Sequence, residues 1–100
     1  MAHRVAARAE ADLDDIWEYV AKESGGMEIA NRLIDSITDR FFLLSSFPQI
    51  GRARHEDFGL GSRSFAVGDY VIVYCLEAED VLVLRVVHGR RDLETLFAIR

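Results

Sequence analysis

The chain has a single cysteine, a single proline and a single lysine among its 100 residues. One cysteine, Cys75, excludes an internal disulfide framework and any zinc site built from several cysteines, so we expect a reducing compartment. No apolar run approaches the length that spans a bilayer, and the N-terminus lacks the apolar core of a secretory signal. These absences predict a soluble, cytoplasmic protein that makes no contact with membranes.

Metal and cofactor signatures are also missing. The histidines at 3, 55 and 88 have no metal-ligand spacing, and no glycine-rich phosphate loop is present. The formal net charge of −5 argues against a broad basic face for coating DNA. We therefore expect no metal, no cofactor and no direct sequence-specific DNA binding by this chain alone.

What the chain does have is enough apolar sequence for one core. Half of the residues are hydrophobic and 29% are charged, which predicts a single domain over residues 1–100. Residues 3–8 read as a short edge strand with Val5 and Ala7 facing inward. An amphipathic helix follows, because apolar residues recur at helical spacing until SGG at 24–26 ends it; these are Leu13, Ile16, Trp17 and Val20.

A second helix begins near Met27 and ends before Pro48, so the short Gly-Gly joint predicts an antiparallel helical hairpin. Strands are expected at 62–67, 70–76 and 81–88, the first two joined by the tight turn Gly68-Asp69. The last residues read as one or two helical turns. The predicted fold class is α+β: an N-terminal helical hairpin packed on a small antiparallel sheet, with a short C-terminal tail.

Several single residues have an ordinary structural interpretation. Cys75 lies in the most apolar strand and Trp17 in the helical stripe, so both are expected in the core. The acidic residues of the first helix are expected on a solvated face, with Glu18 paired to Lys22. They are Asp12, Asp14, Asp15 and Glu18.

The cations of the second half are the candidate binding residues. Eleven of the twelve cations in the chain are arginine, the residue suited to bidentate contacts with carboxylate or phosphate. Strict alternation places Arg85 with Val81, Val83 and Val87, so it is either a structural ion pair, an edge residue or a contact for a partner. After the last strand, Arg90 and Arg91 read equally well as solvated charge or functional contact.

The connection at 48–61 is long for so small a domain, and such loops are often functional. It carries Arg52, Arg54 and His55. If this loop folds back over the end of the sheet, its arginines and Arg63 join the cluster in RVVHGRRDL. The candidate set for binding a partner is Arg52, Arg54, Arg63, Arg85, His88, Arg90 and Arg91.

Four segments together resemble the ParE branch of the RelE/ParE toxins of bacterial toxin–antitoxin systems. They are ADLDDIWEYVAKES, ANRLIDSITDRFFLLSSFPQIGRAR, SRSFAVGDYVIVY and VLRVVHGRRDLETLF. The resemblance spans nearly the whole chain and implies the same hairpin-on-sheet fold. RelE-like members cleave mRNA on the ribosome. Matched to their catalytic pattern, this chain has Val71 where an arginine is expected, Phe97 where a tyrosine is expected, and a match at Arg91.

ParE-like members are instead similar to binding poisons that inhibit DNA gyrase. The resemblance therefore implies a gyrase-binding toxin without catalytic residues. The alternative is a ribosome-dependent endoribonuclease using His88, Arg91 and Arg63, and a third is a member that is no longer toxic. The family also implies a partner, a cognate ParD-like antitoxin with a DNA-binding N-terminus and a C-terminal segment that wraps the toxin.

Overall fold

The computed structural model describes residues 2–53 and 61–89. A short strand leads into two long helices, and four further strands follow. The elements are β1 (His3–Val5), α1 (Ala7–Ser24), α2 (Met27–Ser46), β2 (Arg52–Ala53), β3 (Arg63–Val67), β4 (Tyr70–Glu77) and β5 (Asp80–His88). The predicted C-terminal helical turns lie outside the described residues.

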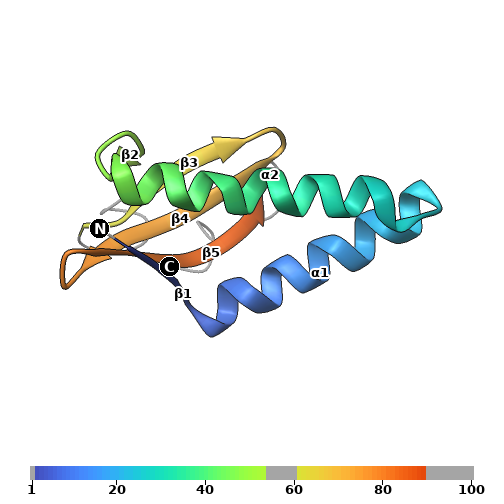
Figure 1. Ribbon diagram of the computed structural model, residues 1–100, viewed down its shortest axis with the longest axis horizontal. Coiled ribbons are helices and arrows are strands. Elements are labelled where there is room, and N and C mark those ends of the chain that lie inside the picture. Colours follow the sequence, from blue (N-terminus) through green and yellow to red (C-terminus); the bar gives the residue numbers. More distant parts are fainter. Residues whose placement is uncertain (1, 54–60, 90–100) are drawn as a thin grey trace.

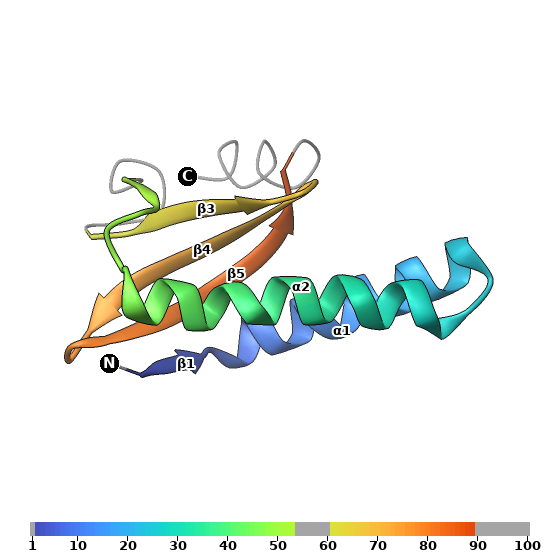
Figure 2. The ribbon, with the colours of Figure 1, turned by 45° about the horizontal axis from the view of Figure 1, so that its top comes forward.

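The strands form one sheet in the order β1-β5-β4-β3-β2. The hairpin of α1 and α2 lies across one face of this sheet, and its tip extends past the sheet (Figure 1). The predicted α+β class is therefore confirmed. The sheet is mixed rather than wholly antiparallel, because β1 pairs parallel with β5 through His3, Arg4 and Val5, beside the start of that strand (Figure 2).

The N-terminal strand is shorter than predicted because α1 begins at Ala7. Val5 packs against the core as expected, whereas Ala7 lies exposed in the helix, so the prediction that it faces inward was wrong. At the other end of α1, Gly25 adopts a φ of 75° and donates its N–H to Ala21. This left-handed geometry favours glycine and allows the chain to reverse into α2, as the SGG stretch predicted.

The core lies between the hairpin and the sheet. The helices contribute small and large apolar residues at helical spacing, among them Ile16, Ile37, Phe41 and Leu44. The strands face them with Ile72, Tyr74, Val81, Val83 and Val86. Each large aliphatic side chain buried in this way contributes about 1.5–3 kcal/mol.

Trp17 does not belong to this core. Its side chain is only partly buried, and its Nε1–H donates to Oδ1 of Asn31 at 2.7 Å. An indole bearing a polar N–H commonly lies where one end is packed and the other is hydrogen-bonded. Trp17 therefore joins α1 to α2 at the solvent side of the hairpin, and the prediction of a core position was wrong.

β4 is the central strand of five, as its apolar sequence predicted. Ile72, Val73 and Tyr74 are buried, but burial decreases beyond them and Leu76 is 43% exposed. Cys75 is only partly buried, so the prediction of a core position was wrong. Its burial, together with the nearby Glu77, still raises the pKa of the Cys75 thiol, although Arg4 opposes the rise. A raised pKa disfavours the thiolate that a nucleophilic cysteine needs.

The regular alternation predicted for the last strand is interrupted by a bulge. Val73 pairs with Arg85, whereas the next residue, Tyr74, pairs with Val83. Leu84 is therefore an extra residue on β5, and the faces exchange at this point. As a result Val86 joins Val81 and Val83 in the core, which strict alternation had placed on opposite faces.

Neither described helix combines the length and the apolar character that crossing a bilayer requires.

Candidate functional site

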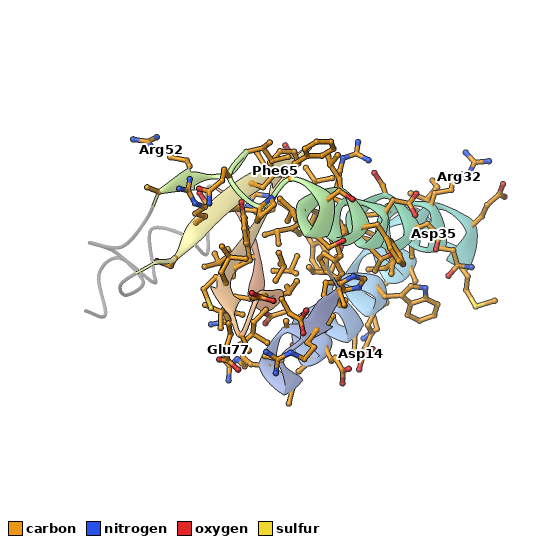
Figure 3. All side chains as sticks on the ribbon, turned by 60° about the vertical axis from the view of Figure 1, so that its left-hand side comes forward. Asp14, Arg32, Asp35, Arg52, Phe65 and Glu77 are labelled. Carbon is orange, nitrogen blue, oxygen red and sulfur yellow. The ribbon has the colours of Figure 1, made fainter. Side chains whose placement is uncertain are left out.

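Arg52 and Arg63 lie side by side at the outer edge of the sheet. In the register of β2 and β3, Arg52 pairs with Ser64 and Ala53 pairs with Arg63. Arg52 is exposed and extends away from β2 (Figure 3). The long connection thus turns back along β3, and it places the two arginines one step apart on neighbouring strands, where alternation directs their side chains to opposite faces of the sheet.

Arg63 is held in contacts within the chain. Its Nη1 donates to the carbonyl oxygen of Gly51 at 2.7 Å, and its Nη2 donates to Oε1 of Gln49 at 2.7 Å. A longer contact joins Nη1 to the carbonyl oxygen of Gln49 at 3.4 Å. The guanidinium therefore spans the loop between α2 and β2 and bonds two of its backbone carbonyls.

Tyr74 of the central strand β4 bonds the same loop. Its hydroxyl donates to the carbonyl oxygen of Pro48 at 2.7 Å and accepts the N–H of Gly51 at 3.0 Å. Burial raises the pKa of Tyr74, opposed by the Gly51 N–H and by the charge of Arg63. The hydroxyl is thus kept protonated and able to donate. Because Arg63 bonds the carbonyl of Gly51 and Tyr74 accepts its N–H, both backbone groups of Gly51 are bonded to side chains.

The loop also approaches the sheet closely at Gly51. A Cβ added there would clash with the Tyr74 hydroxyl and would lie 2.9 Å from the carbonyl oxygen of Ser64. Glycine is required because no side chain has space. The sequence indicated the segment FPQIGRAR but not Tyr74 as a residue that bonds it. The one sign of this role was a hydroxyl group on a residue surrounded by aliphatic residues in β4.

Arg85 is part of a second polar cluster, which joins β5 to α1. Its Nε donates to Oδ2 of Asp12 at 2.8 Å and its Nη2 donates to Oδ1 at 3.1 Å. The backbone N–H of Val86 also donates to Oδ2 of Asp12, at 3.0 Å. Arg85 therefore takes part in a structural ion pair, one of the alternatives that the sequence left open.

The prediction that Asp12 lies on a solvated face was wrong, because its side chain is only 12% exposed. The pair that was predicted on that face, Glu18 with Lys22, is confirmed at 3.1 Å. Asp12, Asp15, Arg8 and Arg85 line a cavity of about 350 Å³ between α1 and β5. The two aspartates and the two arginines of this lining balance in charge, so the described lining offers no surplus cation for an anionic ligand.

His88 ends β5 at the opposite end of the sheet from Arg63. Its ring meets that of Tyr70 edge-on, with centroids 5.4 Å apart. In the sheet register His88 pairs with Tyr70, and Tyr70 pairs with Val67, whereas Arg63 pairs with Tyr74. Four ladder steps and two strands separate Arg63 from His88, a span of roughly 16 Å between backbones.

The candidate binding residues that the structure describes thus fall into separate places. Arg52 and Arg63 share the outer edge, Arg85 faces α1, and His88 lies at the far end of β5. Arg54, Arg90 and Arg91 lie outside the described residues, as do His55 and Phe97. Within the ranges 2–53 and 61–89, no group of three His, Cys, Asp or Glu side chains is arranged to hold a metal.

Val71 of β4 is the residue that the resemblance matches to an arginine of the nuclease pattern. It pairs with Ala66 on one side and Val87 on the other. Its nearest cross-strand neighbours are therefore aliphatic, and neither can bind a phosphate or transfer a proton.

Comparison with known proteins places the chain among toxins. The family model described as the ParE toxin of the type II toxin–antitoxin system parDE matches residues 4–93. Toxin ParE3 of Caulobacter vibrioides is 38% identical over 82 residues, covering 82% of this chain and 80% of that protein. Toxin ParE1 of the same organism is 31% identical over 86 residues, covering 86% of each.

Two solved structures share the fold. One is described as a chromosomal ParDE toxin–antitoxin system from P. aeruginosa, with a TM-score of 0.76 at 20% identity over 88% of this chain and 95% of that chain. The other is the toxin–antitoxin complex RelBE2 from Mycobacterium tuberculosis, with a TM-score of 0.65 at 23% identity over 87% and 95%. At these identities the likeness concerns the fold alone.

Proposed function

Because the chain belongs to the ParE toxin family of type II toxin–antitoxin systems, we propose that it inhibits DNA gyrase by binding, and that a cognate antitoxin neutralises it. Gyrase acts on DNA in the bacterial cytoplasm, so that is where this toxin is expected to work. Free toxin then stalls replication and arrests growth. The observation that carries the choice of a binding inhibitor over a nuclease is the aliphatic environment of Val71.

Cleavage of RNA next to a 2′-hydroxyl requires a group that moves a proton and cations that stabilise charge on the phosphate. Those groups must act on one phosphate, within a few ångströms of each other. Arg63 and His88 are too far apart to do so, and Arg63 already bonds the loop backbone. Both observations support a chain that binds its target without breaking a covalent bond.

The proposal is tested with purified toxin and purified gyrase. Relaxed plasmid, ATP and gyrase are mixed with increasing toxin, and supercoiling is read on an agarose gel. We expect supercoiling to fall as toxin approaches molar excess over gyrase, and to return when the protein encoded by the adjacent antitoxin frame is added. Full supercoiling at a tenfold excess of folded toxin would contradict gyrase as the target.

A second assay separates the nuclease alternative. The toxin is added to a translating extract, and the message is mapped by primer extension. We expect the message to stay intact while cells expressing the toxin show a DNA-damage response. Cuts within codons that disappear in His88→Ala would establish the endoribonuclease instead.

A further inference from the structure

Exposed apolar side chains concentrate at one end of α2 and in the loop that follows. Eight large apolar residues are exposed in the described ranges, and four of them lie between positions 42 and 50: Phe42, Leu43, Phe47 and Ile50. Phe47 is 59% exposed and Ile50 is 47% exposed. Such a concentration on a small domain is typical of a surface that another molecule covers.

These residues do not all face one way. Leu43 lies in the last turn of α2 and Phe47 is the residue that caps this turn, its N–H donating to the Leu43 carbonyl at 2.9 Å. Phe42 points elsewhere, since its ring packs edge-on against His3 of β1 with centroids 4.8 Å apart. Leu43, Phe47, Ile50 and Arg52 are exposed residues of one short segment of chain, and we name them the loop surface.

The backbone of the loop surface is fixed before any partner arrives. The Ile50 N–H donates to the Phe47 carbonyl at 3.2 Å, and the Tyr74 hydroxyl and Arg63 bond Pro48, Gln49 and Gly51. Tyr74 itself is fully buried. A loop ordered in this way loses little conformational entropy on binding, which raises its affinity for a partner.

The charge of this region identifies the kind of partner. The protein carries a net charge of −5, yet residues 43–52, which contain the loop surface, have one arginine, Arg52, and no acidic residue. Arg52 adjoins the apolar residues and is exposed. A complementary partner therefore offers a large apolar side chain together with carboxylates, and charge pairing at the rim orients it.

We propose that the loop surface is a docking site for an acidic, apolar-anchored segment of the antitoxin, with Tyr74 and Arg63 as the positioning residues that hold it ready. This rests on the proposed function, in which an antitoxin binds the chain. It assigns Arg63 a role in holding the loop, in place of contact with RNA.

Binding is measured by calorimetry between the full-length toxin and the full-length protein encoded by the adjacent antitoxin frame. Phe47→Ala and Arg52→Glu are each expected to weaken binding at least tenfold. The matched controls are Phe42→Ala, an equally exposed phenylalanine of α2, and Arg32→Ala, an exposed arginine in α2 paired with Glu28. Both controls are expected to stay within threefold of wild type.

The positioning role has its own readout. Tyr74→Phe removes the bonds to Pro48 and Gly51 but keeps the packed ring. We expect Arg52→Gln to weaken binding severalfold in the wild-type background and less in the Tyr74→Phe background, because the cation is no longer held in place. Equal effects in both backgrounds would show that Tyr74 has a purely structural role and would overturn that part of the proposal.

The outcomes separate this inference from the function it rests on. If the antitoxin binds wild type, Phe47→Ala and Arg52→Glu equally, the loop surface is not its site, although neutralisation stands. If both variants keep antitoxin binding but lose gyrase inhibition, the occupant is the target, and the assignment to the antitoxin is wrong. If wild type binds no antitoxin, the inference and the antitoxin half of the proposed function fail together.

Discussion

The carboxylate of Asp12 in α1 pairs with both nitrogens of one edge of the Arg85 guanidinium and also accepts the N–H of Val86. The strand β1 pairs with β5 only as far as Val83, so beyond that residue no described strand covers this edge of the sheet. Asp12 takes the place of a neighbouring strand at that edge. One side chain thus fixes where α1 lies against the sheet.

Replacing Asp12 by alanine should lower the free energy of unfolding by about 2 kcal/mol, because a mostly buried N–H and a partly buried guanidinium lose a charged acceptor. Urea denaturation followed by circular dichroism measures the change. A double-mutant cycle with Arg85→Ala should give a coupling free energy of about 1.5 kcal/mol. Asp14→Ala is the control, since Asp14 is exposed and points away from the sheet (Figure 3); we expect a change within about 0.5 kcal/mol.

The close approach of Gly51 to Tyr74 predicts a steric requirement. Gly51→Ala should destabilise the fold by about 2 kcal/mol, because its Cβ meets the Tyr74 hydroxyl and the Ser64 carbonyl, and neither a buried ring nor a strand backbone moves easily. Thermal melting reports the loss. At Gly26 an added Cβ meets nothing within 4 Å, and Gly26→Ser supplies a helix N-cap, so that control should match or exceed wild type in stability. Equal melting temperatures for Gly51→Ala and wild type would refute the contact.

The buried hydroxyl of Tyr74 also predicts a dependence on alkaline pH. Burial raises the pKa of Tyr74 above its ordinary value of 10.0. The unfolded chain therefore ionises this group first, and the stability that it contributes is complete below pH 10 and is lost as pH rises through the folded pKa. Unfolding free energies measured from pH 8 to pH 11 should fall more steeply for wild type than for Tyr74→Phe. Parallel profiles would show that this hydroxyl does not titrate as its burial requires.

The fold was predictable because apolar periodicity and turn residues act locally. The spacing of Leu13, Ile16 and Val20 specifies a helix face wherever the helix packs, and Gly25 ends that helix through its own backbone freedom. What could not be predicted from local pattern was the bulge at Leu84. It is a feature of the register between β4 and β5, and it lies beside the N–H of Val86, whose acceptor Asp12 is about seventy residues earlier in the chain.

For the candidate site, too, local features were predictable from the sequence and tertiary contacts were not. Composition identified arginine as the residue type that matters, and the long loop as the unusual segment. The partners of each arginine depend on tertiary contacts: Arg85 meets Asp12, and Arg63 meets the backbone of Gly51. Spacing along the chain contains no information about such pairs, so sequence alone could not show that Arg85 packs α1 against the sheet while Arg63 shapes a loop.

The turn between β4 and β5 stores backbone strain that substitution should release. Ala78 and Glu79 both have positive φ, at 52° and 70°, in a two-residue hairpin turn where asparagine and glycine are preferred. Each such residue costs about 1 kcal/mol relative to one that adopts the left-handed region readily. Relieving both residues contributes about 2 kcal/mol, and the conformational entropy that glycine loses on folding offsets about 1 kcal/mol of it. Ala78→Asn combined with Glu79→Gly should therefore raise the free energy of unfolding by about 1 kcal/mol, measured by urea denaturation. Glu79→Gln, which removes the charge but keeps the strain, should leave the free energy of unfolding unchanged.

Arg4 binds Glu77 and Asp80 on either side of this turn. A gain in stability seen only when Arg4 is also replaced would show that those ion pairs, and not φ, limit the stability of the hairpin.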